Sequence, residues 1–131
     1  MKVLQFAGGN KDSKWIGLVA HGATTSPFRE KDRIPTLISP YVSEIYSIVL
    51  PMHCKEGTDI NQRNNDTKGP PKRFISTEGA ISLIQEAIRP IVEGKKVLIV
   101  AYSLGALFLI KSWKLIRELS LDCFGVFIGN R

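Results

Sequence analysis

Ser103 is the residue whose type and position best fit a chemical role. It follows an apolar, strand-forming run at 96–101 and precedes a run of helix-forming residues. Ala101 and Gly105 flank it at a spacing of two, and such small residues allow a sharp turn at which backbone segments approach closely. This turn would lift the hydroxyl clear of a sheet and point the first amides of a helix at a reacting carbonyl group. The pattern predicts a nucleophilic serine beside an oxyanion-binding helix terminus.

A second candidate turn is formed by His21 and Gly22, which end the apolar run 15–20. If both runs are parallel strands, their carboxyl ends lie at the same edge of one sheet, where ligands of parallel sheets bind. We therefore expect His21 and Ser103 to lie at a common edge.

The elements that must position these residues alternate between strand and helix patterns. Apolar runs predict strands at 3–7, 15–20, 46–50, 96–101 and 123–128, and helical periodicity predicts helices at 34–45, 76–93 and about 104–119. Pro40 should kink the first helix or mark its first turn. A polar stretch, 54–73, predicts an exposed loop. The alternation indicates an α/β fold with a mostly parallel sheet covered on both faces.

Length and composition set further bounds. The chain has 131 residues, 44% of them hydrophobic, which predicts a single domain spanning 1–131. No run approaches the ~20 apolar residues of a transmembrane segment, and no signal-peptide core is visible, so we expect a cytoplasmic protein. Cys54 and Cys123 have neither metal nor disulfide spacing and are expected to be free thiols, and we expect no cofactor and no metal site.

The net charge of +6 would favour anionic partners, but the charges are scattered. Lys111, Lys114 and Arg117 share one predicted helical face, a spacing that a solvated surface explains. No nucleic-acid-binding motif accompanies the basic residues, so we expect no nucleic-acid partner.

The two turns together resemble the α/β-hydrolase superfamily. Ala101-x-Ser103-x-Gly105 is similar to its nucleophile elbow, His21-Gly22 is similar to its oxyanion segment, and residues 50–57 resemble the strand end and loop after its first helix. The resemblance implies a three-layer sandwich and a serine hydrolase acting on a small-molecule carboxylic ester or thioester. It also implies that Ser103 is the nucleophile, that the backbone amides of Ala23 and Leu104 form the oxyanion hole, and that His21 and Gly22 shape the oxyanion loop.

The resemblance covers only the first half of that fold. Members carry an acid and then a histidine after the nucleophile, but no histidine follows Ser103 here, and the acids after it are Glu118 and Asp122. Asp122 should begin its strand and so lie at the edge opposite the serine. His21 and His53 follow strands and are the remaining candidate bases. We therefore expect a truncated α/β-hydrolase fold, and whether it is active alone stays open.

The alternative reading is a non-catalytic remnant or a binding subunit. The last predicted strand, 123–128, would leave an apolar edge without a neighbour, and such an edge pairs readily with another chain. In this reading, a second chain completes the sheet.

Overall fold

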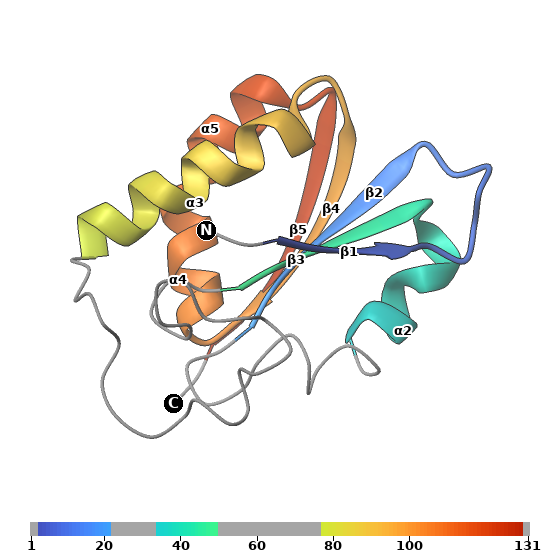
Figure 1. Ribbon diagram of the computed structural model, residues 1–131, viewed down its shortest axis with the longest axis horizontal. Coiled ribbons are helices and arrows are strands. Elements are labelled where there is room, and N and C mark those ends of the chain that lie inside the picture. The colour runs from blue at the N-terminus through green and yellow to red at the C-terminus, as the bar shows by residue number, and fades with distance from the viewer. Residues whose placement is uncertain (1–2, 22–33, 50–76, 130–131) are drawn as a thin grey trace.

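The computed structural model describes residues 3–21, 34–49 and 77–129. Its centre is a five-stranded sheet in the order β1-β3-β2-β4-β5 (Figure 1). The strands are β1 (Val3–Ala7), β2 (Trp15–Ala20), β3 (Glu44–Ile48), β4 (Lys96–Tyr102) and β5 (Asp122–Ile128), and the helical segments are α2 (Ile34–Ile38), η1 (Ser39–Tyr41), α3 (Thr77–Val92), α4 (Leu104–Lys111) and α5 (Trp113–Leu119). β1 is antiparallel to β3 and the other pairings are parallel. The predicted α/β class with a mostly parallel sheet is confirmed.

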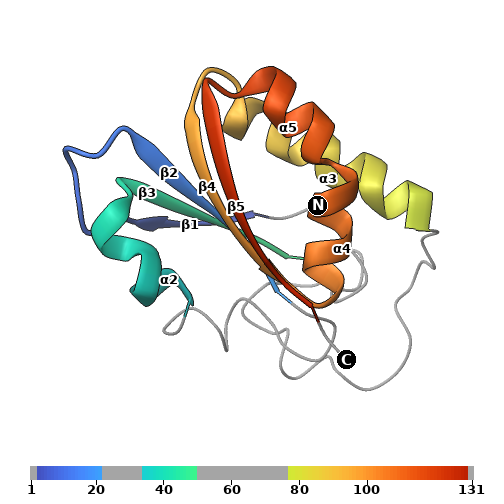
Figure 2. The same cartoon turned by 180° about the vertical axis from the view of Figure 1, so that it is seen from behind.

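Helices lie on both faces of this sheet. α3, α4 and α5 cover one face and α2 covers the other, as the two opposite views show (Figures 1 and 2). Adjacent residues of β2 point into different clusters: Leu18 packs in the larger cluster under α3 and α4, and Val19 packs in the smaller one with Ile38 of α2. This two-sided burial explains why β2 and β4 are continuously apolar rather than alternating.

The helix predicted at 34–45 is wrong in its second half. The α-helix ends at Ile38, a 3₁₀ turn follows, and Val42 is already extended. Val42 and Ile45 are fully buried, but Ile45 belongs to β3. Pro40 lies in the 3₁₀ turn rather than inside a longer helix, because proline lacks the N–H that would continue the ladder. A helix with this spacing and a turn followed by a strand would both bury residues 42 and 45, so the apolar pattern does not distinguish the two structures.

The helix predicted at 104–119 is divided at Ser112. α4 ends at Lys111, and the buried Ser112 hydroxyl donates to the Phe108 carbonyl at 3.0 Å. Gln85 of α3 donates to the same hydroxyl at 3.4 Å. A serine bonded to the carbonyl four residues before it competes with the helical ladder and favours a bend. Lys111 and Lys114 therefore lie on separate helices, although both are exposed as expected.

The strand predicted at 46–50 instead begins at Glu44 and ends at Ile48, and the other predicted elements within the described residues agree closely with the structure. α3 ends just before Gly94, whose φ of +70° is the left-handed conformation typical of a helix terminator. Cys123 lies near the start of β5 as a free cysteine. The expected loop at 54–73, together with His53 and Cys54, lies outside the described residues. Among the helices that are described, none has the length and apolar character needed to cross a bilayer.

Candidate active site

Ser103 occupies the turn between β4 and α4 and has a strained backbone. Its φ is 54° and its ψ is −126°, and it is the only residue other than glycine with a positive φ in the described part of the chain. Such a conformation costs of order 1–3 kcal/mol and persists only where its surroundings enforce it. The strain therefore marks this turn as one that the rest of the fold holds in place.

Two backbone hydrogen bonds hold the serine. Its N–H donates to the carbonyl of Ile128 at the end of β5 at 2.9 Å, and its own carbonyl accepts from Leu107 in α4 at 3.2 Å. Its hydroxyl makes no capping bond to the helix. A serine at the start of a helix most often serves as a side-chain cap, but here the hydroxyl does not fill that role.

Gly105 fits against the backbone after β2. Its N–H donates to the His21 carbonyl at 3.1 Å, and a Cβ at this position would lie 2.5 Å from that oxygen and 2.8 Å from the Ala20 carbonyl carbon. Both contacts are with backbone, which cannot move aside as a flexible side chain does. The expectation that only a small residue fits at this position of the turn is confirmed.

His21 and Ser103 lie at the same edge of the sheet, as expected. β2 and β4 are parallel neighbours in which Ala20 is paired with Ala101, so the residues following both strands emerge together. His21 is fully buried, and its carbonyl is the acceptor for Gly105. The structure therefore joins the two sequence motifs by a direct backbone contact.

Leu104 supplies the first amide of α4. The first hydrogen bond of the helix runs from Leu107 to Ser103, so the Leu104 N–H precedes the ladder and has no acceptor within the helix. The next amide, that of Gly105, is already bonded to His21. α4 buries Gly105, Ala106, Phe108 and Leu109, so its axis is fixed against the sheet. Among the amides of Leu104 and Gly105, Leu104 is therefore the donor that an anion beside Ser103 would meet.

The other residues predicted for the site either lie outside the described residues or are distant from Ser103. Gly22, Ala23 and His53 lie outside the described residues, so the structure places only His21, Ser103 and Leu104. Asp122 begins β5 opposite Lys96, and its carboxylate accepts from the Cys123 N–H at 2.9 Å. Because a strand of this length rises ~20 Å, Asp122 lies at the far edge of the sheet from Ser103. This position agrees with the prediction that Asp122 lies too far from Ser103 to be its catalytic acid.

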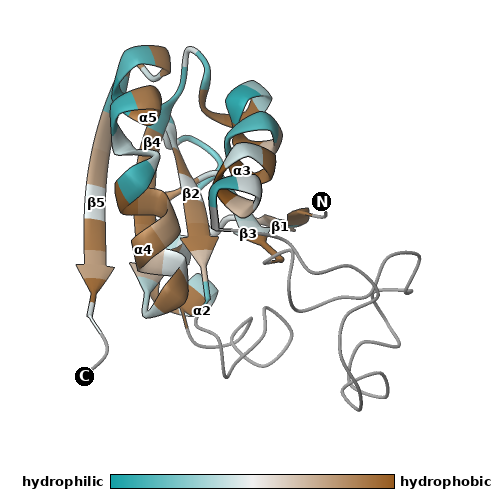
Figure 3. Cartoon of the chain, turned by 90° about the vertical axis from the view of Figure 1, so that its left-hand side faces the viewer, coloured by the Kyte–Doolittle hydropathy of each residue, from teal (hydrophilic) through white to brown (hydrophobic). Residues whose placement is uncertain are grey.

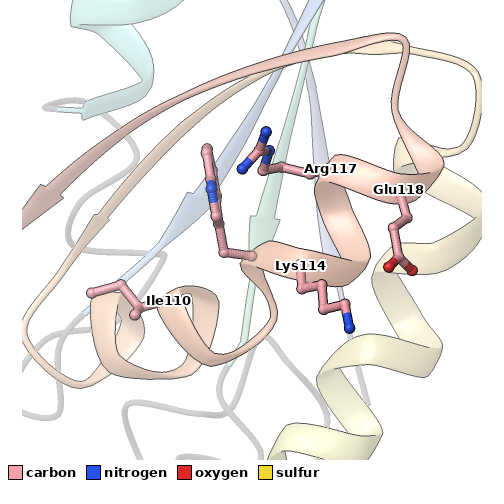
Figure 4. A pocket seen from close by; sticks show the side chains of 5 residues that line it. Ile110, Lys114, Arg117 and Glu118 are labelled. Atoms are coloured by element: carbon pink, nitrogen blue, oxygen red, sulfur yellow. The ribbon is translucent and has the colours of Figure 1, made fainter.

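Glu118 also lies away from the serine. It lines an open pocket of about 530 Å³ with Ile110, Trp113, Lys114 and Arg117 at the junction of α4 and α5 (Figure 4). Ile110 is seven residues beyond Ser103, or about 10 Å along the helix. The pocket is thus separate from the serine turn and adds no group to it.

Sequence reasoning missed the support that β5 gives to the site. The Ile128 carbonyl that holds Ser103 is a backbone group, so no residue type signals it; only the register of β4 against β5 would have placed it there. In the residues that the structure describes, no group of His, Cys, Asp and Glu side chains is arranged to hold a metal ion. Comparison of the sequence with models of protein families and with curated proteins finds no match in either set.

Proposed function

We propose that this chain carries the nucleophile and oxyanion elements of an α/β-hydrolase-type serine hydrolase that acts on a carboxylic ester or thioester. The observation that carries the proposal is the strained Ser103 turn, whose helix is bonded through Gly105 to the backbone of His21. Helices on both faces of a mostly parallel sheet are compatible with the hydrolase sandwich. Strained backbone conformations occur mostly at active sites and ligand-binding sites, so the conformation of Ser103 favours a functional role.

In this proposal, the Ser103 oxygen attacks the carbonyl carbon of the substrate. The carbonyl oxygen becomes an oxyanion that accepts hydrogen bonds from the amides of Leu104 and Ala23, each contributing about 3 kcal/mol toward the tetrahedral intermediate. His21 and Gly22 shape the loop that presents Ala23. The bond to the alcohol or thiol then breaks, the leaving group takes up the serine proton, and water later hydrolyses the acyl-serine.

Loss of the serine proton limits the rate of acylation in this proposal. A serine hydroxyl without a base is a weak nucleophile, although an oxyanion hole alone retains part of the catalysis. Both histidines of the sequence precede Ser103, and the side chain of His21 is buried. We therefore expect this chain alone to acylate slowly, and to form a covalent adduct most readily with an activated phosphonate.

A fluorophosphonate probe tests the proposal. The probe phosphonylates a serine hydroxyl and releases fluoride, so intact-mass spectrometry should show one adduct on the folded protein, mapped by peptide sequencing to Ser103. Ser103→Ala should abolish the adduct. Ser120→Ala is the matched control, because the Ser120 hydroxyl is bonded to the Ile116 carbonyl at the end of α5 and should not react. Folded protein that acquires no adduct would overturn the enzymatic proposal.

A second candidate is a non-catalytic binding subunit. The exposed apolar side chains of β5 favour it, since Phe124, Val126 and Ile128 all face solvent on one side of an edge strand. In that case the probe leaves Ser103 unmodified and the protein is nevertheless stably folded.

A further inference from the structure

We propose that β5 pairs with β5 of a second copy of this chain, so that two sheets join into one across a twofold axis at Gly125. Within the described part of the chain, β5 has a neighbouring strand, β4, on one side only. Figure 3 shows it as a largely hydrophobic strand at the outer edge of the sheet. The proposal is independent of the chemistry of Ser103.

The backbone of β5 presents a defined set of hydrogen-bonding groups. Because the Ile128 carbonyl accepts from Ser103, the backbone groups of residues 124, 126 and 128 point toward β4. The N–H and C=O groups of Cys123, Gly125 and Phe127 therefore point outward from the edge. The Cys123 N–H is bonded to the Asp122 carboxylate, which blocks only the first position.

These groups are self-complementary about Gly125. In an antiparallel pair centred there, Gly125 bonds to its own copy, and the Cys123 carbonyl of each chain accepts from the Phe127 N–H of the other, while the Cys123 N–H stays bonded to Asp122. Phe124 then lies directly opposite Val126 of the second copy, with Cα atoms about 4.5 Å apart. Apolar residues thus face apolar residues on both sides of the axis, as a twofold interface requires.

Exposed apolar side chains lie beside this edge on both faces of the sheet. Of the eight exposed large hydrophobic residues in the described part of the chain, five lie on β5 or on the adjacent α4; they are Phe124 (61% exposed), Val126 (41%), Ile128 (48%), Leu107 (43%) and Ile110 (53%). At roughly 200 Å² per large residue they expose about 500 Å² per copy. The β5 side chains lie on the face of α2 and the α4 side chains on the opposite face, so the interface reaches the ~1,000 Å² of a specific complex when both groups are covered.

β5 also lacks the features that usually protect an edge strand. It has no proline and no lysine. The opposite edge, β1, is shorter and exposes Gln5 and Ala7 rather than large apolar side chains. The net charge of +6 on each copy opposes association, so we expect the dimer to tighten as salt screens this repulsion. An acidic partner on the same surface would show the opposite salt dependence.

Sedimentation equilibrium on the full chain tests the proposal. The unmodified protein should be a dimer whose dissociation constant falls as salt rises. Phe124→Lys and Val126→Lys should each raise that constant more than about tenfold, because each brings an ammonium group into an apolar contact. Leu37→Lys is the matched control: Leu37 is 69% exposed on α2, a helix that packs on β2, two strands from β5, and its replacement should leave the dimer intact. Ser103→Ala should also dimerise, so failure of the hydrolase proposal and failure of this one are distinguishable.

A crosslink tests the register. Phe124→Cys and Val126→Cys are combined in a chain whose Cys54 and Cys123 are replaced by serine. Air oxidation should give a covalent dimer in which peptide mapping finds residue 124 of one chain joined to residue 126 of the other. Circular dichroism establishes that each variant is folded. A monomer at all concentrations, a dimer that tolerates lysine at 124 and 126, or a crosslink in another register would overturn the proposal.

Discussion

The backbone N–H of Gly105 donates to the carbonyl oxygen of His21 at 3.1 Å, and this bond joins the two turns that follow β2 and β4. It also removes the Gly105 amide from the donors available to a ligand. The serine turn and the His21 backbone are thus positioned relative to each other by main-chain groups. A change at Gly105 should therefore affect both.

Gly105→Ala should destabilise the protein by about 1–3 kcal/mol, because the added Cβ would lie 2.5 Å from the His21 oxygen. Urea denaturation measures this change. Gly129→Ala is the control, since nothing lies within 4 Å of a Cβ at that position, and it should be nearly neutral. Equal stability of the two variants would contradict the close approach of Gly105 to His21.

Ser103→Gly should be more stable than Ser103→Ala by about 1 kcal/mol or more. Both variants lack the hydroxyl, but only glycine relieves the strain of φ 54° and ψ −126°. Thermal or chemical denaturation of the two variants side by side gives the difference. If alanine is tolerated as well as glycine, the turn is not strained.

The free energy of unfolding should depend on pH through the ionisation of Tyr46. Its pKa is raised from 10.0 to about 12, chiefly by burial, and also by the hydrogen bond that its hydroxyl donates to Glu44 at 2.7 Å and by the charge of that carboxylate. Between these values the unfolded phenol loses its proton while the folded one keeps it, so the free energy of unfolding should decrease as pH rises. Below pH 10 the phenol is protonated in both states, and its full contribution to the stability of the folded protein is present.

Tyr46→Phe isolates this effect. The variant has no titrating phenol, so the difference in unfolding free energy between the two proteins should change between pH 10 and 12 and stay constant from pH 7 to 9. A constant difference over the whole range would show that folding does not raise the pKa of Tyr46.

Ser112→Ala should destabilise the protein by about 1 kcal/mol, because Gln85 on α3 loses its acceptor and the Phe108 carbonyl loses a donor. Combining it with Gln85→Leu should cost less than the sum of the two single changes, since both remove the same interaction. A double-mutant cycle by urea denaturation measures the coupling. Strict additivity would show that the α3 contact does not hold this bend.

The strands and the serine turn were predictable because their signals are local. Continuous apolar runs identified β2 and β4, and two small residues flanking Ser103 identified the turn. Helix limits were less predictable, because Val42 and Ile45 satisfy helical spacing while belonging to a turn and a strand. The break at Ser112 is accompanied by a contact from Gln85 of α3, which is distant in sequence and has no local signature.

The site was predictable in part for the same reason. The apolar runs before His21 and Ser103 predicted that both residues follow parallel strands and so lie at one edge of the sheet. The parallel pairing of β2 with β4 confirms this prediction. The Gly105 to His21 bond and the Ile128 carbonyl behind Ser103 are main-chain contacts between distant segments. They depend on strand register, which the sequence pattern leaves undetermined. The roles of Ser103, Leu104 and Ala23 in catalysis stay predictions.

The hydrogen bond from the Ser103 backbone N–H to the Ile128 carbonyl links the serine turn to β5, the outermost strand of the described sheet. A strand added at the free side of β5 would therefore be separated from the serine turn by β5 alone, with one main-chain contact between β5 and that turn.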